Sequence, residues 1–168
     1  IIISDIDEIP NLEDNNITSI KNKIIFFKQK YFHYKFNLEL EKYIWHGSKA
    51  CKKKNLISPQ WLRNIKSKAY PFWRVDTFFS NKKYQDIKFI DRGGWHFSNL
   101  KKPADIEKKM KTYLHHREYD LNPLGINKIE EIITNKKAIY NLNADQRENK
   151  YDSSQKLIEA DINEMPSY

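Results

Sequence analysis

The sequence predicts an α/β fold in which helices flank a mixed β-sheet. Short apolar runs bounded by turn residues are typical of strands, and two amphipathic stretches repeat with a helical period. The chain also contains 10 Tyr, 9 Phe and 4 Trp among its 168 residues. Disordered chains are poor in aromatic residues, so we expect most of this chain to fold.

Five short segments have the composition of strands. Three isoleucines at the start indicate the end of a fully buried strand, and residues 31–38 alternate between aromatic and polar side chains. We expect this alternating run and the apolar run before it to form a hairpin. Residues 43–51 are irregular or strand-like around Gly47. The predicted strands are residues 1–4, 24–28, 31–38, 87–90 and 95–98, with a turn at residues 91–94.

Four segments predict helices. Pro10 opens the first. Ser58 and Pro59 start the second, with serine as the cap and proline in the first turn. In the third, Ile106 and Met110 lie on one face. The predicted helices are residues 12–20, a short segment from residue 58, residues 103–114 and residues 126–135.

The composition limits the class of protein. We expect residues 1–140 to form one folded domain and residues 141–168 a polar, weakly helical tail. Cys51 is the only cysteine, which excludes an intrachain disulfide. No apolar run reaches the length of a membrane span. The chain starts inside an apolar run and without Met, so we expect further residues upstream.

The chain is basic, with a formal net charge of +8. Such a balance attracts anions, whether nucleic acid, acidic membrane surfaces or phosphorylated small molecules. Most lysines are scattered, as on an ordinary solvated surface, and only Lys52, Lys53 and Lys54 form a tight run. Charge alone therefore leaves the partner open.

An acidic run, Ser-Asp-Ile-Asp-Glu, follows the first predicted strand at residues 4–8. Ligands of open α/β sheets bind beyond the carboxyl ends of strands. On an extended segment Asp5 and Asp7 point to one side, and Ile6 turns back to the core. Paired carboxylates hold Mg2+ or Mn2+, which in turn neutralises a diphosphate. The alternative is a solvated loop that caps the next helix.

Three further stretches accompany the acidic run. They are the aromatic strand at 34–38 followed by Trp-His-Gly at 45–47, Gly-Gly-Trp-His-Phe-Ser at 93–98, and His-Arg-Glu-Tyr at 116–119. Together with the acidic run, these stretches resemble glycosyltransferase family 17. Their order and rough spacing agree with the family from Ser4 to Tyr140. That family contains the β-1,4-mannosyl-glycoprotein β-1,4-N-acetylglucosaminyltransferases. His115 departs from the family pattern, which has Ser before this His.

The resemblance implies a GT-A fold, of which this chain holds the metal loop and the acceptor-side half. The nucleotide-binding half is then expected upstream. The implied partners are a UDP-sugar donor, with N-acetylglucosamine as the sugar, and a glycan acceptor, with Mn2+ or Mg2+ as cofactor and no nucleic acid. The family leaves the compartment open: the cytoplasm for a bacterial protein, or the Golgi lumen for a eukaryotic one. No membrane anchor is visible in this sequence.

The resemblance also suggests roles for individual residues. Asp5, Asp7 and His96 are the expected metal ligands, and these three bind the donor together with Trp95 and His116. An inverting transferase needs a carboxylate base for the acceptor hydroxyl, and the candidates are Glu118 and Asp91. Each has a structural alternative. His96 fits a buried histidine beside Trp95, Asp91 a turn former, and Glu118 a salt-bridge partner.

Two other classes stay open. A phosphohydrolase of the haloacid-dehalogenase type would use Asp5 as nucleophile. Its motif continues with Gly-Thr, however, where this chain has Glu8 and Ile9. A basic nucleic-acid-binding module would combine the lysine run at 52–54 with the aromatic strand as a stacking platform.

Overall fold

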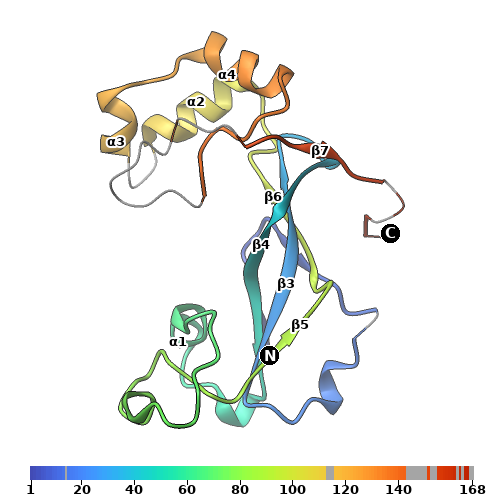
Figure 1. The fold of residues 1–168 in the computed structure, drawn as a ribbon, viewed down its shortest axis with the longest axis vertical. Coiled ribbons are helices and arrows are strands. Elements are labelled where there is room, and N and C mark those ends of the chain that lie inside the picture. Colours follow the sequence, from blue (N-terminus) through green and yellow to red (C-terminus); the bar gives the residue numbers. More distant parts are fainter. Residues whose placement is uncertain are drawn as a thin grey trace. The chain divides into compact units, whose positions relative to one another are not determined.

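The computed structural model describes residues 1–13, 15–112, 116–142, 151, 155–161, 163 and 165–166, and only the backbone of residues 116–118. The chain divides into two compact units. The first comprises Ile1–Lys30, Tyr43–His96 and Pro166–Tyr168, and the second comprises Tyr31–Lys42 and Phe97–Met165. Long strands run through both units, and each unit is described separately below (Figure 1).

A mixed seven-stranded sheet forms the framework, which confirms the predicted α/β class. Its strands follow the order β1-β4-β3-β6-β2, with β5 paired parallel to β3 and β7 antiparallel to β4. The strands are β1 (Ile2–Ile3), β2 (Glu8–Pro10), β3 (Ile24–His33), β4 (Leu38–Cys51), β5 (Ile87–Ile90), β6 (Gly94–Ser98) and β7 (Ile158–Glu159).

Local sequence explains the helices. The Ser58 hydroxyl accepts a hydrogen bond from the Trp61 amide and Pro59 occupies the first turn, so α1 begins as predicted. The helices predicted from residues 103 and 126 are also present, with Ile106 and Ile129 buried. The helices are α1 (Pro59–Asn64), α2 (Pro103–Thr112), α3 (His116–Leu121) and α4 (Ile126–Thr134). None of the described helices is long and apolar enough to cross a membrane.

The core of the first unit lies on both faces of β3. Side chains alternate along a strand, so Ile24 and Phe26 pack with Leu62 of α1, whereas Ile25 and Phe27 pack on the opposite face. A strand covered on both faces has a continuous apolar sequence. This explains why the run from residue 24 has no polar alternation.

The second unit has its own core. The rings of Phe32 and Phe97 stack with their centroids 5.2 Å apart. Ile106 and Met110 of α2 are buried, and so is Ile129 of α4, which packs against α2. The buried apolar faces of α2 and α4 are those that the helical period predicts.

Two predictions near the amino terminus are wrong. The described part of residues 12–20 does not form the predicted helix. It contains only a 3-10 turn, Ile17–Ser19, because asparagine side chains compete for local hydrogen bonds. Asn11 accepts from the Glu13 amide, and Asn16 from the Thr18 hydroxyl. The first strand is not fully buried either, because β1 is a two-residue edge strand and Ile1 is 49% exposed.

The predicted hairpin lies elsewhere. Residues 24–33 form one strand, and the chain turns at residues 34–37, where Tyr34 has a φ of 62°. The polar residue Gln29 does not interrupt the strand because it is buried and donates to the Ser48 hydroxyl on β4. In the carboxyl-terminal tail the sequence predicts a weak helix near residues 153–162, but the part of this range that the structure describes contains β7 instead. The rest of that segment lies outside the described residues.

Candidate functional site

The acidic run forms a tight turn. The Glu8 amide donates to the Asp5 carbonyl over 3.1 Å, and Ile6 at the tip is fully exposed. The prediction that Ile6 packs into the core is therefore wrong. The turn is needed because β1 pairs with β4 whereas β2 pairs with β6, so the chain must change partners between Ile3 and Glu8. Asp5 and Asp7 consequently meet different neighbours.

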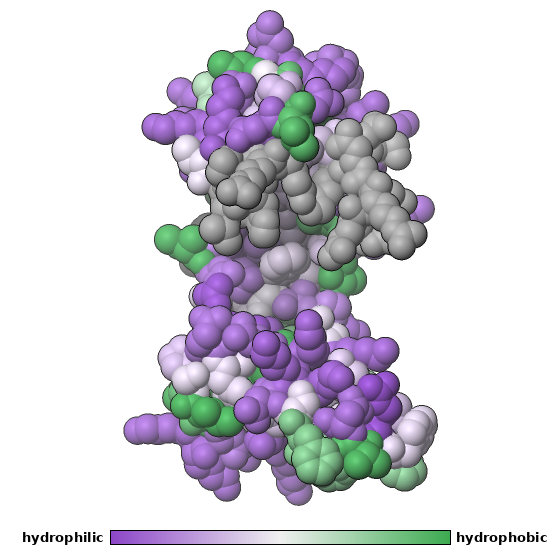
Figure 2. Space-filling view, turned by 90° about the vertical axis from the view of Figure 1, so that its left-hand side faces the viewer, coloured by the Kyte–Doolittle hydropathy of each residue, from purple (hydrophilic) through white to green (hydrophobic). Residues whose placement is uncertain are grey.

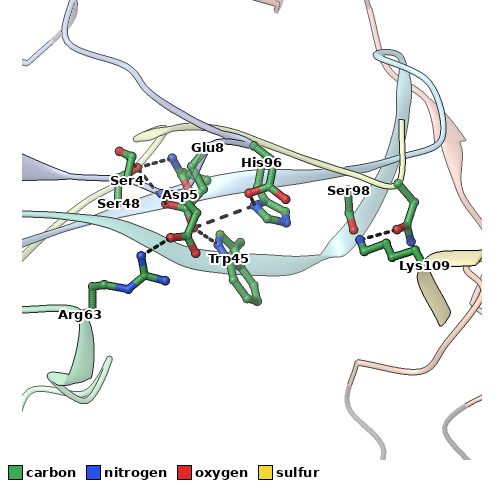
Figure 3. A network of polar contacts seen from close by, with 12 residues as sticks. Ser4, Asp5, Glu8, Trp45, Ser48, Arg63, His96, Ser98 and Lys109 are labelled. Carbon is green, nitrogen blue, oxygen red and sulfur yellow. Dashed lines mark hydrogen bonds and ion pairs between the residues drawn. The ribbon is translucent and has the colours of Figure 1, made fainter. Parts of the chain in front are cut away.

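Asp5 forms an ion pair with an arginine that the sequence reading did not assign to the site. Its Oδ1 lies 2.6 Å from Nη1 of Arg63, and both side chains are about half exposed. Arg63 belongs to the last turn of α1, and this short helix is fixed by the Ser58 cap and by buried Leu62. Figure 3 shows the Arg63 guanidinium reaching the Asp5 carboxylate.

Glu8 is the centre of a buried hydrogen-bond network. Its Oε1 accepts from the Trp45 indole N–H over 2.7 Å, and its Oε2 accepts from the Asp5 amide and the Ser48 hydroxyl (Figure 3). Ser48 also shares a 2.7 Å hydrogen bond with the Ser4 hydroxyl. These contacts tie the acidic turn to β4. A buried carboxylate with several donors is held in one position.

His96 lies opposite Glu8 in the β2–β6 register. It is buried, and its Nδ1 is 3.9 Å from Asp7 Oδ1 and 4.0 Å from Glu8 Oε1. Its ring stacks on Trp45, with the centroids 4.7 Å apart. Trp95 is its neighbour on β6, and alternation along the strand turns Trp95 to the opposite face. The structure thus brings His96, Asp7 and Glu8 together but not Trp95.

Two glycines allow this close packing. A Cβ on Gly47 would collide with the Glu8 carboxylate and the Trp45 indole. Gly94 has a φ of 129° and is paired with Pro10, and a side chain there would strike the Ile9 carbonyl. The glycines in the Trp-His-Gly and Gly-Gly-Trp-His segments therefore let β4 and β6 approach the acidic turn.

Lys49 adds a second cation. Its ammonium is almost buried and donates to the backbone carbonyls of Arg63 and Ile65, so it links β4 to the end of α1. Burial lowers the pKa of Lys49 to about 8, although the charges of Glu8 and Asp5 oppose this shift. Burial also lowers the pKa of His46, with Lys28 and Lys49 adding to the effect.

These side chains surround a pocket of about 140 Å3 within the first unit. Two carboxylates and two cations face it, together with the Trp45 indole and His46. Its lining residues are Ile3, Ser4, Asp5, Glu8, Trp45, His46, Gly47, Lys49 and Arg63. Such a mixture can bind a ligand that carries both anionic oxygens and hydroxyl groups.

The pocket fits a divalent cation only if a bound substrate supplies part of the coordination. Among the described residues, no three His, Cys, Asp or Glu side chains are placed to hold a metal ion by themselves. Mg2+, however, is usually held by one or two carboxylates together with substrate phosphates. Asp5 lines the pocket and fits this second arrangement, in which a bound diphosphate supplies most of the oxygens. Asp7, on the same turn, is not among the lining residues and lies beside His96.

The remaining predicted site residues either lie away from the pocket or have side chains outside the described part of the chain. Asp91 follows β5 and does not line the pocket. Its exposed carboxylate pairs with Lys28 over 2.8 Å, which holds its pKa below the usual range. A lowered pKa does not favour a general base. His116 and Glu118 belong to α3, but their side chains lie outside the described residues, so their roles stay predictions.

A wider pocket of about 660 Å3 belongs to the second unit. Three lysines and the exposed ring of Phe36 line it, an arrangement that suits a polar ligand with a face for stacking. The lining residues are Tyr34, Lys35, Phe36, Asn37, Leu100, Lys101, Lys102 and Met165.

In comparisons of the chain with protein-family models, with curated proteins and with solved structures, nothing matches at a significant level. The chemistry of the pocket and the motifs that form it are therefore the guide to function.

Proposed function

We propose that this protein is a GT-A-type glycosyltransferase that moves a sugar from a UDP-sugar to a glycan acceptor with inversion. N-acetylglucosamine is the proposed sugar, and Mn2+ or Mg2+ the cofactor. The observation that carries the proposal is the pocket in which the Asp5–Glu8 turn meets Arg63 and Lys49. A nucleoside diphosphate leaving group calls for this combination of carboxylates and cations.

Each side chain has a role in this proposal. Asp5 and Asp7 would hold the metal together with the diphosphate, and the metal supplies Lewis acidity for the departing UDP. Arg63 offers the diphosphate a second charge, because its guanidinium is half exposed and can turn from Asp5 to a phosphate oxygen. Glu8 is a positioning residue that fixes the turn and Trp45.

The motifs support the same reading. The segments that resemble family 17 lie far apart in the sequence, yet three of them supply Asp5, Trp45 and His96 around one network. The fourth contains Glu118, the proposed base, on α3.

Calorimetric titration with UDP-N-acetylglucosamine tests the proposal. We expect the natural protein to bind the nucleotide sugar only in the presence of Mn2+. Asp7→Asn should weaken binding about 10-fold or more, because it removes a ligand charge, and even outer-shell partners are worth that much. Asp105→Asn, at an exposed position on α2, is the matched control and should bind normally.

Two results would overturn the proposal. One is nucleotide-sugar binding that is independent of metal and unchanged in Asp7→Asn. The other is phosphatase turnover that Asp5→Asn abolishes, which would assign the site to the phosphohydrolase class instead.

A further inference from the structure

Residues 66–86 of the first unit expose an unusual group of apolar side chains. Phe72, Trp73, Val75, Phe78 and Phe79 are each between 66% and 89% exposed. In Figure 2, apolar side chains gather in the lower part of the view, where Figure 1 places this segment, among hydrophilic ones. Contiguous apolar exposure of this kind marks an interaction surface.

Hydrogen bonds and ion pairs hold the segment together. Arg74 clamps Asp76 with two hydrogen bonds of 2.7 and 2.8 Å, and Lys83 adds an ion pair of 2.7 Å. Gln85 donates to the Thr77 hydroxyl and to the Phe72 carbonyl, and Thr77 is buried. Polar side chains therefore hold the turn together, whereas the aromatic ones face solvent. This is the reverse of an ordinary surface loop.

Cations surround the apolar group. The Lys66 amide donates to the Lys82 carbonyl, and the Tyr70 amide to the Tyr84 carbonyl, so the two ends of the segment lie side by side. The cationic groups of Lys68, Arg74 and Lys83 lie within 6.0 Å of the Tyr70 ring centroid. Residues 66–86 contain two acidic side chains, Asp76 and Asp86, against five basic ones, Lys66, Lys68, Arg74, Lys82 and Lys83.

We propose that residues 66–86 form a docking site for the surface of an anionic phospholipid bilayer. Tryptophan rings settle at the level of the lipid headgroups, phenylalanine rings are buried at the boundary with the acyl chains, and nearby lysines and arginines attract acidic lipids. Both features occur here on one short segment. The proposal rests on this surface alone and not on the proposed glycosyl transfer.

A second copy of the chain is a poorer occupant. In a twofold-symmetric dimer the same patch would face itself. The excess positive charge of the two segments would then meet across the interface and oppose association. The same charge favours an anionic partner, and the aliphatic and phenyl side chains suit hydrocarbon better than a hydrogen-bonding surface.

Vesicle co-sedimentation tests the proposal. We expect the protein to bind vesicles of phosphatidylcholine with phosphatidylglycerol, and to bind pure phosphatidylcholine weakly. The double variant Phe78→Ser/Phe79→Ser should lower the partition coefficient about 10-fold or more, because two phenyl groups lose their apolar burial. Leu121→Ser, which removes an equally exposed apolar side chain from the other unit, should leave it unchanged.

Charge and fluorescence give independent readouts. Lys68→Glu/Lys82→Glu should remove the preference for anionic vesicles, and added salt should weaken binding of the unaltered protein. Trp73 is the most exposed tryptophan, so its emission should shift to the blue on vesicle addition, and Trp73→Phe should abolish that shift. Far-UV circular dichroism verifies that each variant is folded.

Several outcomes would overturn the proposal. They are no binding to anionic vesicles, equal losses in Leu121→Ser, or a dimer that Phe78→Ser/Phe79→Ser dissociates in sedimentation velocity. Oligonucleotide binding that the same variant abolishes, without vesicle binding, would assign the surface to nucleic acid instead.

Discussion

Among single residues, Glu8 has the largest structural role in the candidate site. Its carboxylate is buried and accepts hydrogen bonds from the Asp5 amide, the Trp45 indole and the Ser48 hydroxyl. The indole and the hydroxyl belong to β4, and the amide belongs to the acidic turn itself. The geometry of the acidic turn therefore depends on this one side chain.

Replacement of Glu8 by alanine should destabilise the protein. Each buried donor left without an acceptor costs about 1–3 kcal/mol, and we expect a total loss of about 2–4 kcal/mol in the free energy of unfolding. Glu8→Gln keeps an acceptor for Trp45 and should fall between alanine and the natural residue. Chemical denaturation measures both. Glu130→Ala, on the exposed face of α4, should change stability by less than about 0.5 kcal/mol.

The Glu130→Ala control decides whether Glu8 holds the turn. If Glu8→Ala unfolds at the same denaturant concentration as the Glu130→Ala control, the hydrogen-bond network does not hold the turn.

Among the elements, β4 and α1 are joined by the buried ammonium of Lys49. Burial lowers its pKa from 10.5 to about 8, so the unfolded chain keeps this proton at a higher pH than the folded one. Stability rises with pH wherever the unfolded state binds more protons. Below pH 8, burial of the charged ammonium therefore lowers the free energy of unfolding by its full amount. This loss of stability disappears as the pH approaches 10.5.

Comparison with Lys49→Met tests this link between β4 and α1. Between pH 8 and pH 10.5, the free energy of unfolding of the natural protein should rise relative to that of the variant. The rise should approach about 3 kcal/mol. Methionine is uncharged and similar in length. The difference in free energy of unfolding between the two proteins therefore removes the contribution of all other titrating groups. A constant difference across this range would show that Lys49 titrates alike in the folded and unfolded states.

Elements with local sequence signals were predictable. The Ser58-Pro59 start of α1 and the apolar stripes of α2 and α4 are each encoded by neighbouring residues. So is the predicted turn after β5, although Gly94 already belongs to β6. The continuation of β3 through Gln29 was not, because Gln29 finds its partner Ser48 on another strand. The acidic turn was misread as extended for a similar reason, since strand pairing imposes it.

The candidate site shows the same division. The sequence indicated Asp5, Asp7 and His96, because acidic and histidine residues stand out in motifs. Arg63 and Lys49 were missed, because the fold of α1 against β4 brings them to the pocket. The only local sequence signal for either residue was that Arg63 is a basic residue in the last turn of a capped helix.

For the whole molecule, the charge of +8 suits two anionic partners. In the two proposals, Arg63 and Lys49 at the pocket attract a diphosphate, and the aromatic rings and lysines of residues 66–86 attract a lipid surface. The two proposals concern different residues and are tested by different variants. A nucleotide-sugar transferase held at a membrane surface would act on acceptors displayed there.

A transfer assay tests the central proposal most directly. The natural protein is incubated with UDP-N-acetylglucosamine, Mn2+ and a panel of glycan acceptors, and the products are analysed by mass spectrometry and NMR. We predict UDP release coupled to a β-linked sugar on the acceptor, lost without metal and in Asp7→Asn. Products that retain the α configuration of the donor, or transfer that is undiminished in Asp7→Asn and without metal, would contradict the proposal.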